Sequence, residues 1–77
     1  MNLNNINDLW GQYNSYLSCL NECDRLINLF NNLVPFSTLI TEDEYNNVIN
    51  VLSTLRMNFD NILQNDIQRI QHYYRNH

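Results

Sequence analysis

Residues 34–45 read Val-Pro-Phe-Ser-Thr-Leu-Ile-Thr-Glu-Asp-Glu-Tyr, and this stretch divides the sequence into two helical halves. Pro35 ends the first helix, because the residue before a proline is pushed out of the helical conformation. Further along, Thr41 and Glu44 have the spacing of a capping box, in which each side chain accepts a hydrogen bond from the other residue's backbone N–H. A second helix is therefore predicted to begin at residue 42.

Before Pro35, apolar and aromatic residues recur at alternating steps of three and four. This set is Ile6, Leu9, Tyr13, Tyr16, Leu20, Cys23, Ile27, Phe30 and Val34. A mean spacing of about 3.5 residues is that of a left-handed coiled-coil seam, and it predicts a helix over about residues 5–34. Gly11 lies inside this helix and costs about 1 kcal/mol relative to alanine. A short separate N-terminal helix, ending near Trp10 and Gly11, is therefore an alternative.

After Thr41, the apolar stripe has a slightly longer mean spacing of about 3.6 residues. Its positions are Tyr45, Val48, Leu52, Leu55, Phe59, Leu63, Ile67, Ile70 and Tyr74, and Ile49, Val51, Ile62 and Tyr73 widen it. Acidic residues fill the first turn and basic residues the last turns, which is the distribution that a helix dipole favours. We predict a second helix over about residues 42–75.

The fold class that follows is all-α, an antiparallel two-helix hairpin of coiled-coil type that assembles into a helical bundle. Residues 1–77 form a single domain in which residues 35–41 connect the helices. The tightest packing is expected at the closed end, where three residues of the first helix face three of the second. These are Leu20, Ile27 and Phe30 against Leu52, Leu55 and Val48.

The hairpin is not expected to be stable alone. About 12 of the 16 asparagines fall inside the two helices, and at roughly 0.6 kcal/mol each they remove about 7 kcal/mol of helix propensity. The first helix also carries apolar flanks on both sides of its seam, with Leu3, Trp10 and Leu17 on one side and Cys19, Leu26 and Leu33 on the other. We therefore expect self-association, as a homodimer, or docking in a hetero-complex with a partner protein.

The composition disfavours several other partners. The chain has a formal net charge of −4, four arginines and no lysine, so it can release few counterions from a nucleic-acid backbone. An anionic membrane is disfavoured for the same reason. Residues 1–9 lack the cationic flank and continuous apolar core of a signal peptide or spanning helix. We expect a soluble cytoplasmic protein.

Cys19 and Cys23 are four residues apart, a spacing that directs helical side chains poorly for a disulfide. A zinc site would need two further ligands nearby. The Cys-x3-Cys spacing resembles one half of the twin motif in small mitochondrial intermembrane-space proteins, although the second half is absent. Two reduced cysteines in or near the core are favoured, with a redox or intermolecular role and a metal site as alternatives.

Two charged clusters have structural explanations beside functional ones. Arg69, His72 and Arg75 alternate with tyrosines near the C-terminus, as bases and aromatics do in single-strand nucleic-acid binders, but they also compensate the helix dipole. Glu42, Asp43 and Glu44 could form a cation or basic-partner site, but the capping box is the favoured explanation of these residues. No glycine-rich loop, activated serine or paired His-carboxylate motif is present. We expect no enzyme activity, cofactor, metal or small-molecule substrate.

The densest aromatic patch is predicted to be the partner-binding site. It comprises Trp10, Tyr13, Tyr16 and Leu17 in the first helix, with Tyr73 and Tyr74 from the second. Such residues anchor protein interfaces, although burial of the patch within the hairpin would use them as well.

In size, hairpin layout and a C-terminal helix that ends in Tyr73-Tyr74-Arg75, the chain resembles small co-chaperones of type III secretion needle subunits. It equally resembles coiled-coil subunits of larger complexes and phage-encoded inhibitors, and no motif separates these groups. The leading hypothesis is a non-catalytic protein–protein interaction module, a small subunit, co-chaperone or inhibitor that binds partner helices through its apolar stripes. The alternative is a nucleic-acid or nucleoprotein binder that uses the basic-aromatic C-terminus.

Overall fold

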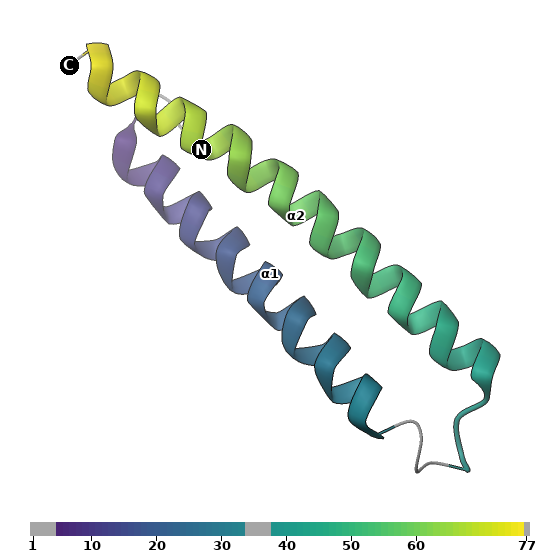
Figure 1. The fold of residues 1–77 in the computed structure, drawn as a ribbon. Coiled ribbons are helices and arrows are strands. Elements are labelled where there is room, and N and C mark those ends of the chain that lie inside the picture. The colour runs from purple at the N-terminus through teal and green to yellow at the C-terminus, as the bar shows by residue number, and fades with distance from the viewer. Residues whose placement is uncertain (1–4, 34–37, 77) are drawn as a thin grey trace.

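The computed structural model describes residues 5–33 and 38–76, which form two long α-helices packed as an antiparallel hairpin (Figure 1). Helix α1 spans Ile6–Leu33 and helix α2 spans Glu42–Asn76. The hairpin measures 57 × 19 × 14 Å. The first turn of α1 lies beside the last turns of α2 at what we call the open end, and the connection forms the closed end. The all-α hairpin predicted from the sequence is confirmed.

Neither helix is long and apolar enough, within the residues described, to cross a membrane.

Helix α1 is continuous from its first turn, so the alternative of a separate N-terminal helix is wrong. The Asn5 side chain caps it, because Oδ1 accepts the Asn7 N–H at 2.8 Å. The Asn5 carbonyl accepts the N–H groups of Asp8 and Leu9 at 3.1 and 3.2 Å. Leu9 is only 4% exposed, and burial of a leucine contributes about 2 kcal/mol. This burial offsets the helix propensity that Gly11 costs.

Helix α2 begins with the predicted capping box. The Glu44 N–H donates to Thr41 Oγ1 at 3.1 Å, and the Thr41 N–H donates to Glu44 Oε1 at 3.1 Å. The pKa of Glu44 is lowered, first by the hydrogen bond from the Thr41 backbone and then by the Thr41 hydroxyl. Both interactions stabilise the ionised carboxylate.

The seam of α1 lies where its spacing predicts. Every described member of the predicted set, from Ile6 to Phe30, is buried or half-buried. The last member, Val34, lies outside the described residues, as do Leu3 on one predicted flank and the side chain of Leu33 on the other.

The seam of α2 differs from the prediction. Leu55 and Tyr74, which were expected in it, are 40% and 59% exposed. A strict alternation of steps of four and three fits the observed burial better, and it gives Tyr45, Ile49, Leu52, Arg56, Phe59, Leu63, Asp66, Ile70 and Tyr73. This seam contains two charged residues, Arg56 and Asp66. The predicted spacing for α2 was too long because Ile67 was assigned to the seam in place of Asp66.

The best-buried part of the core lies in the middle and toward the open end, and the expectation of tightest packing at the closed end is wrong. The buried apolar residues are Leu9, Leu20, Cys23, Leu63 and Ile70. Phe30 and Leu52, near the closed end, are half-buried. Polar residues explain this difference in part, because Asn31 and Tyr45 bond to each other across the helices there.

Contacts between polar or aromatic side chains connect α1 and α2 along most of the hairpin and fix its register. From the open end to the closed end these pairs are Trp10–Tyr74, Gln12–Asp66, Tyr16–Phe59, Asp24–Arg56 and Asn31–Tyr45.

Candidate functional site

Four aromatic residues meet at the open end, and we call Trp10, Tyr13, Tyr73 and Tyr74 the open-end aromatic cluster. The Trp10 and Tyr13 rings are 5.8 Å apart, edge to face at 85°. Trp10 Nε1–H donates a hydrogen bond to the Tyr74 hydroxyl at 3.2 Å. Tyr73 and Tyr74 also meet edge to face, with ring centroids 5.5 Å apart. These contacts hold the four rings in fixed mutual positions.

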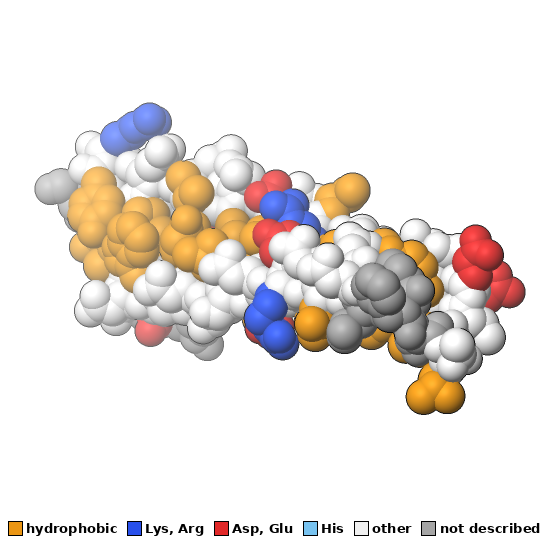
Figure 2. Space-filling view, turned by 60° about the horizontal axis from the view of Figure 1, so that its bottom comes forward, with side chains coloured by type: hydrophobic (Ala, Val, Ile, Leu, Met, Phe, Trp, Pro, Cys, Tyr) orange, Lys and Arg blue, Asp and Glu red, His pale blue; other side chains and the backbone are white. Residues whose placement is uncertain are grey.

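The cluster is only partly covered by the hairpin. Trp10 is 40% and Tyr74 59% exposed, whereas Tyr13 and Tyr73 are half-buried. Figure 2 shows hydrophobic side chains gathered in a band that runs along one face from the open end to mid-length. The band ends where arginine and acidic side chains meet. The hairpin therefore leaves Trp10 and Tyr74 exposed to solvent.

One residue of the predicted patch, Tyr16, packs against the other helix. Tyr16 is half-buried and lies 5.9 Å from the Phe59 ring, tilted by 37°. Leu17 is half-buried beside it in the chain. The structure thus separates Tyr16, which packs across the seam, from the open-end aromatic cluster.

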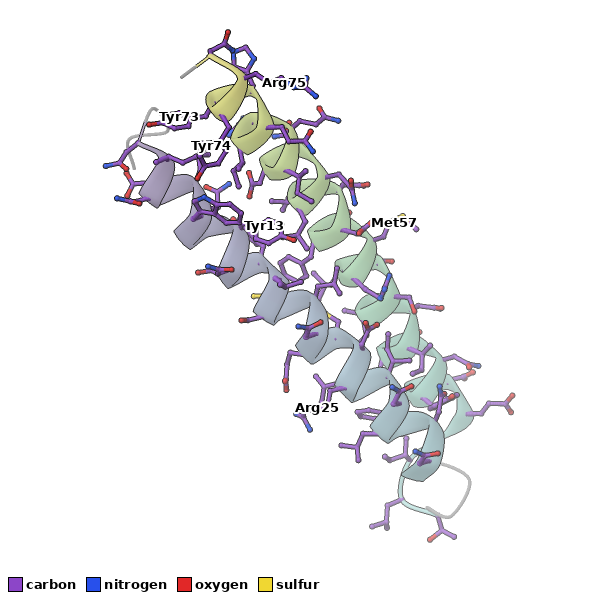
Figure 3. The ribbon with its side chains drawn as sticks, turned by 60° about the vertical axis from the view of Figure 1, so that its left-hand side comes forward. Tyr13, Arg25, Met57, Tyr73, Tyr74 and Arg75 are labelled. Atoms are coloured by element: carbon purple, nitrogen blue, oxygen red, sulfur yellow. The ribbon has the colours of Figure 1, made fainter. Side chains whose placement is uncertain are left out.

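The three bases of the nucleic-acid hypothesis do not form one surface with the tyrosines. Arg69, His72 and Arg75 are all exposed. In Figure 3, Arg75 points away from α1, whereas Tyr73 and Tyr74 point toward it. His72 is bonded within its own helix, because Asn76 Nδ2 donates to its carbonyl at 2.9 Å. Arg69 and Arg75 lie on different sides of the helix, since successive residues are rotated by about 100°.

A polar contact inside the seam was not predicted. Asp66 is 0% exposed, and Gln12 Nε2 donates to its two carboxylate oxygens at 2.8 and 3.0 Å. The ion pairs within residues 5–33 and 38–76 join Arg25 to Glu22 and Arg56 to Asp24, so neither includes Asp66. Strict 3-4 spacing places Asp66 in the seam. This spacing could have identified Asp66 from the sequence, whereas a search for apolar residues passes over it.

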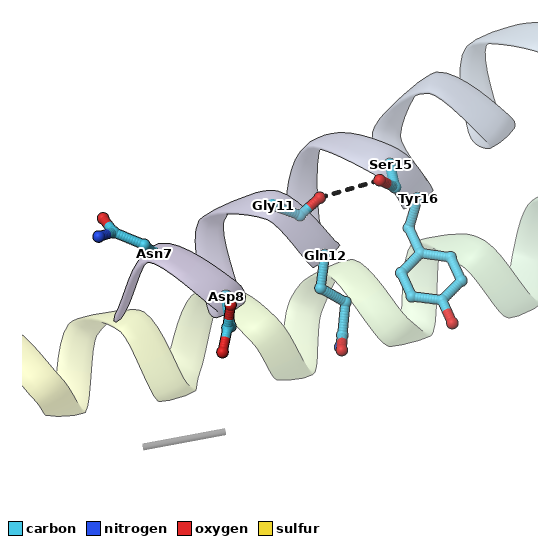
Figure 4. A pocket seen from close by; sticks show the side chains of 6 residues that line it. All are labelled: Asn7, Asp8, Gly11, Gln12, Ser15 and Tyr16. Atoms are coloured by element: carbon cyan, nitrogen blue, oxygen red, sulfur yellow. Dashed lines mark hydrogen bonds between the residues drawn. The ribbon is translucent and has the colours of Figure 1, made fainter. Parts of the chain in front are cut away.

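Beside this contact, α1 carries a shallow depression of about 410 Å³ (Figure 4). Asn7, Asp8, Gly11, Gln12, Ser15 and Tyr16 line it. A Cβ atom built on Gly11 would meet nothing within 4 Å, so the space above the glycine is open. The Ser15 hydroxyl donates to the Gly11 carbonyl at 3.0 Å. The lining offers carboxylate, amide and hydroxyl groups without an imidazole or thiol.

A second contact between the helices, here between two charged residues, lies near mid-length. Arg56 Nε donates to Asp24 Oδ1 at 2.5 Å. This hydrogen bond, together with the charge of Asp24, raises the pKa of Arg56. Both side chains are nearly half exposed, so water screens the attraction between them. The pair therefore contributes more to the register of the helices than to the stability of the hairpin.

Cys19 and Cys23 are both free thiols, the first exposed and the second buried in the seam. Within the described ranges, 5–33 and 38–76, no three histidine, cysteine or acidic side chains lie together as a metal site.

No family model matches the chain, and neither the curated proteins nor the solved structures contain a significant match to it.

Proposed function

We propose that the chain is a non-catalytic protein–protein interaction module that binds helices of a partner protein at its open end. The observation that carries this proposal is the exposure of Trp10 and Tyr74 within an ordered aromatic cluster. Aromatic side chains dominate binding energy at interfaces, particularly tryptophan and tyrosine. Because the hydrogen bond and ring contacts already fix these side chains, binding would cost little additional conformational entropy.

The shape of the surface supports a helical partner. The exposed apolar side chains follow the helix axes as a band rather than lining a deep pocket (Figure 2). A partner helix with apolar residues at steps of three and four would lie along this band and bury it. A small subunit, a co-chaperone and an inhibitor all act through such a contact.

The nucleic-acid alternative has less support. The formal net charge is −4, and Arg75 does not share a face with the tyrosines. A binder of single strands needs basic and aromatic groups along one groove.

To test the proposal, the full chain is immobilised and incubated with an extract of its source cells. Proteins retained by the wild type are identified by mass spectrometry and compared with those retained by a Trp10→Ala/Tyr74→Ala variant. Met57→Ala is the matched control, because Met57 is 64% exposed but lies outside the aromatic cluster.

We expect a protein that binds the wild type and the control but not the double variant, while circular dichroism shows equal helix content for all three chains. Identical retention by the wild type and the double variant would contradict the proposal. Retention of nucleic acid that disappears in Arg69→Ala/Arg75→Ala would favour the alternative.

A further inference from the structure

A second apolar surface lies on the other side of the hairpin from the open-end aromatic cluster. Trp10 and Tyr74 bond across the seam and mark one side of it. Helical rotation of about 100° per residue places five apolar residues on the opposite side, in the middle of the hairpin and toward its closed end. These residues are Leu26, Leu29, Val51, Leu55 and Ile62, and we call them the lateral apolar face.

This face is substantially exposed. Leu29, Val51 and Leu55 are 41%, 58% and 40% exposed, and Leu26 and Ile62 are half-buried. On α2, the positions that continue the face toward either end are uncharged until Glu44 on one side and Arg69 on the other. On α1, Glu22 lies on the same side as Leu26 and Leu29 and pairs with Arg25, so the uncharged stretch belongs to α2. An exposed apolar stretch with charges only at its ends is typical of a protein interface.

The elongated hairpin exposes more surface than a compact chain of the same mass. The chain exposes 5774 Å², whereas a compact monomer of 9.3 kDa would expose roughly 5,000 Å². The excess of roughly 800 Å² follows from the elongated shape and is comparable with the area that one subunit buries in an interface of standard size.

The distribution of residues along α2 is self-complementary. Val51 and Ile62 are equally far from the midpoint between residues 56 and 57, and so are Glu44 and Arg69. An antiparallel α2 from a second copy, related by a two-fold axis at this midpoint, would place Val51 against Ile62. The same axis would place the Glu44 carboxylate near the Arg69 guanidinium twice.

We propose that the lateral apolar face binds a second copy of this chain, giving a two-fold symmetric four-helix bundle in which the two α2 helices are antiparallel. The dimer goes beyond the proposed function, because it leaves the open-end aromatic cluster of both subunits uncovered. Each dimer would then present two partner-binding surfaces.

Sedimentation equilibrium of the full chain tests the proposal at micromolar concentrations. The wild type is expected at twice the chain mass. Leu55→Asp should raise the dissociation constant of the dimer by at least about 100-fold, because it places two carboxylates in the interface. Met57→Asp is the matched control, because Met57 is more exposed than Leu55 and points away from α1 (Figure 3). It should leave the dimer intact.

The Trp10→Ala/Tyr74→Ala variant separates this proposal from the proposed function, since it should remain dimeric while losing partner capture. A wild-type chain that sediments as a monomer would overturn the proposed dimer. So would a Trp10→Ala/Tyr74→Ala variant that is monomeric together with a Leu55→Asp variant that remains dimeric. Partner capture is measured independently, so either proposal can fail while the other stands.

The orientation is tested by oxidative crosslinking of Val51→Cys mixed with Ile62→Cys, in a background where Cys19 is serine and Cys23 is alanine. The mixture should form a covalent dimer much faster than either variant alone. Equal crosslinking of Val51→Cys with itself would overturn the antiparallel arrangement of the two α2 helices.

Discussion

Gln12→Leu should destabilise the hairpin although it makes the chain more apolar. The Gln12 amide supplies the hydrogen bonds that both carboxylate oxygens of Asp66 accept, at 2.8 and 3.0 Å. Asp66 is 0% exposed, so water cannot replace the lost donor. Removing one partner of a buried polar pair leaves the other with its full desolvation penalty.

The expected loss is about 1 to 4 kcal/mol. Breaking a buried charged contact costs about 3 to 5 kcal/mol, and the half-buried leucine recovers about 1 to 2 kcal/mol of that by apolar burial. A domain of this length has a free energy of unfolding of about 4 to 12 kcal/mol, so the loss is a large part of the total. The second substitution, Asp66→Leu in the Gln12→Leu chain, should restore stability to within about 1 kcal/mol of the wild type.

Urea unfolding followed by circular dichroism measures these differences, and the single variant should unfold about 1 to 3 M earlier. Gln64→Leu is the matched control, because Gln64 is exposed on α2 and the same change there should alter stability by less than about 0.5 kcal/mol. The reasoning is refuted if Gln12→Leu costs no more than Gln64→Leu, or if the double variant is as unstable as the single one.

Three further predictions follow from burial, open space and capping. Gly11→Ala should raise the free energy of unfolding by about 0.5 to 1 kcal/mol, seen as a higher Tm, because the new Cβ meets nothing within 4 Å. Leu63→Ala should cost about 2 to 5 kcal/mol in chemical unfolding, because Leu63 is 5% exposed and its truncation leaves a cavity. Glu44 has a folded pKa below its ordinary value of 4.5, so its contribution to stability is present above that pH and is lost as pH falls through the lower folded pKa. Glu44→Gln should therefore flatten the acid side of the stability profile, and an unchanged profile would contradict this account.

The ends of the helices and the seam of α1 could be predicted from the sequence because each depends on local or periodic signals. The capping box needs only Thr41 and Glu44 at the correct spacing, and the structure contains both of its hydrogen bonds. The α1 seam is apolar throughout, so hydrophobic periodicity alone locates it.

The seam of α2 was misplaced because two of its members are charged. Hydrophobic periodicity cannot distinguish a buried aspartate from a solvent-exposed one, and the partner of Asp66 lies 54 residues away. Similarly, Leu55 matches the apolar pattern but is 40% exposed. Which apolar residues face the partner helix depends on the register, and tertiary contacts fix that register.

The candidate site could be predicted by residue type but not by arrangement. Trp10 and Tyr74 were both expected in the partner-binding patch, yet their hydrogen bond depends on the offset between two helices. That offset also decides that Tyr16 packs on Phe59 and so belongs to the core.

The register contacts also determine where the chain can be lengthened. The Gln12–Asp66 and Asp24–Arg56 contacts fix how far one helix is shifted along the other, and both lie far from the connection between the helices. The register of the helices therefore does not depend on the length of the connection. Doubling the length of a flexible loop costs only about 0.6 kcal/mol. Leu39 is 90% exposed, and the bond between Leu39 and Ile40 is a suitable point for inserting a tag or a whole domain. Such an insertion would emerge at the closed end and leave the aromatic surface at the opposite end clear.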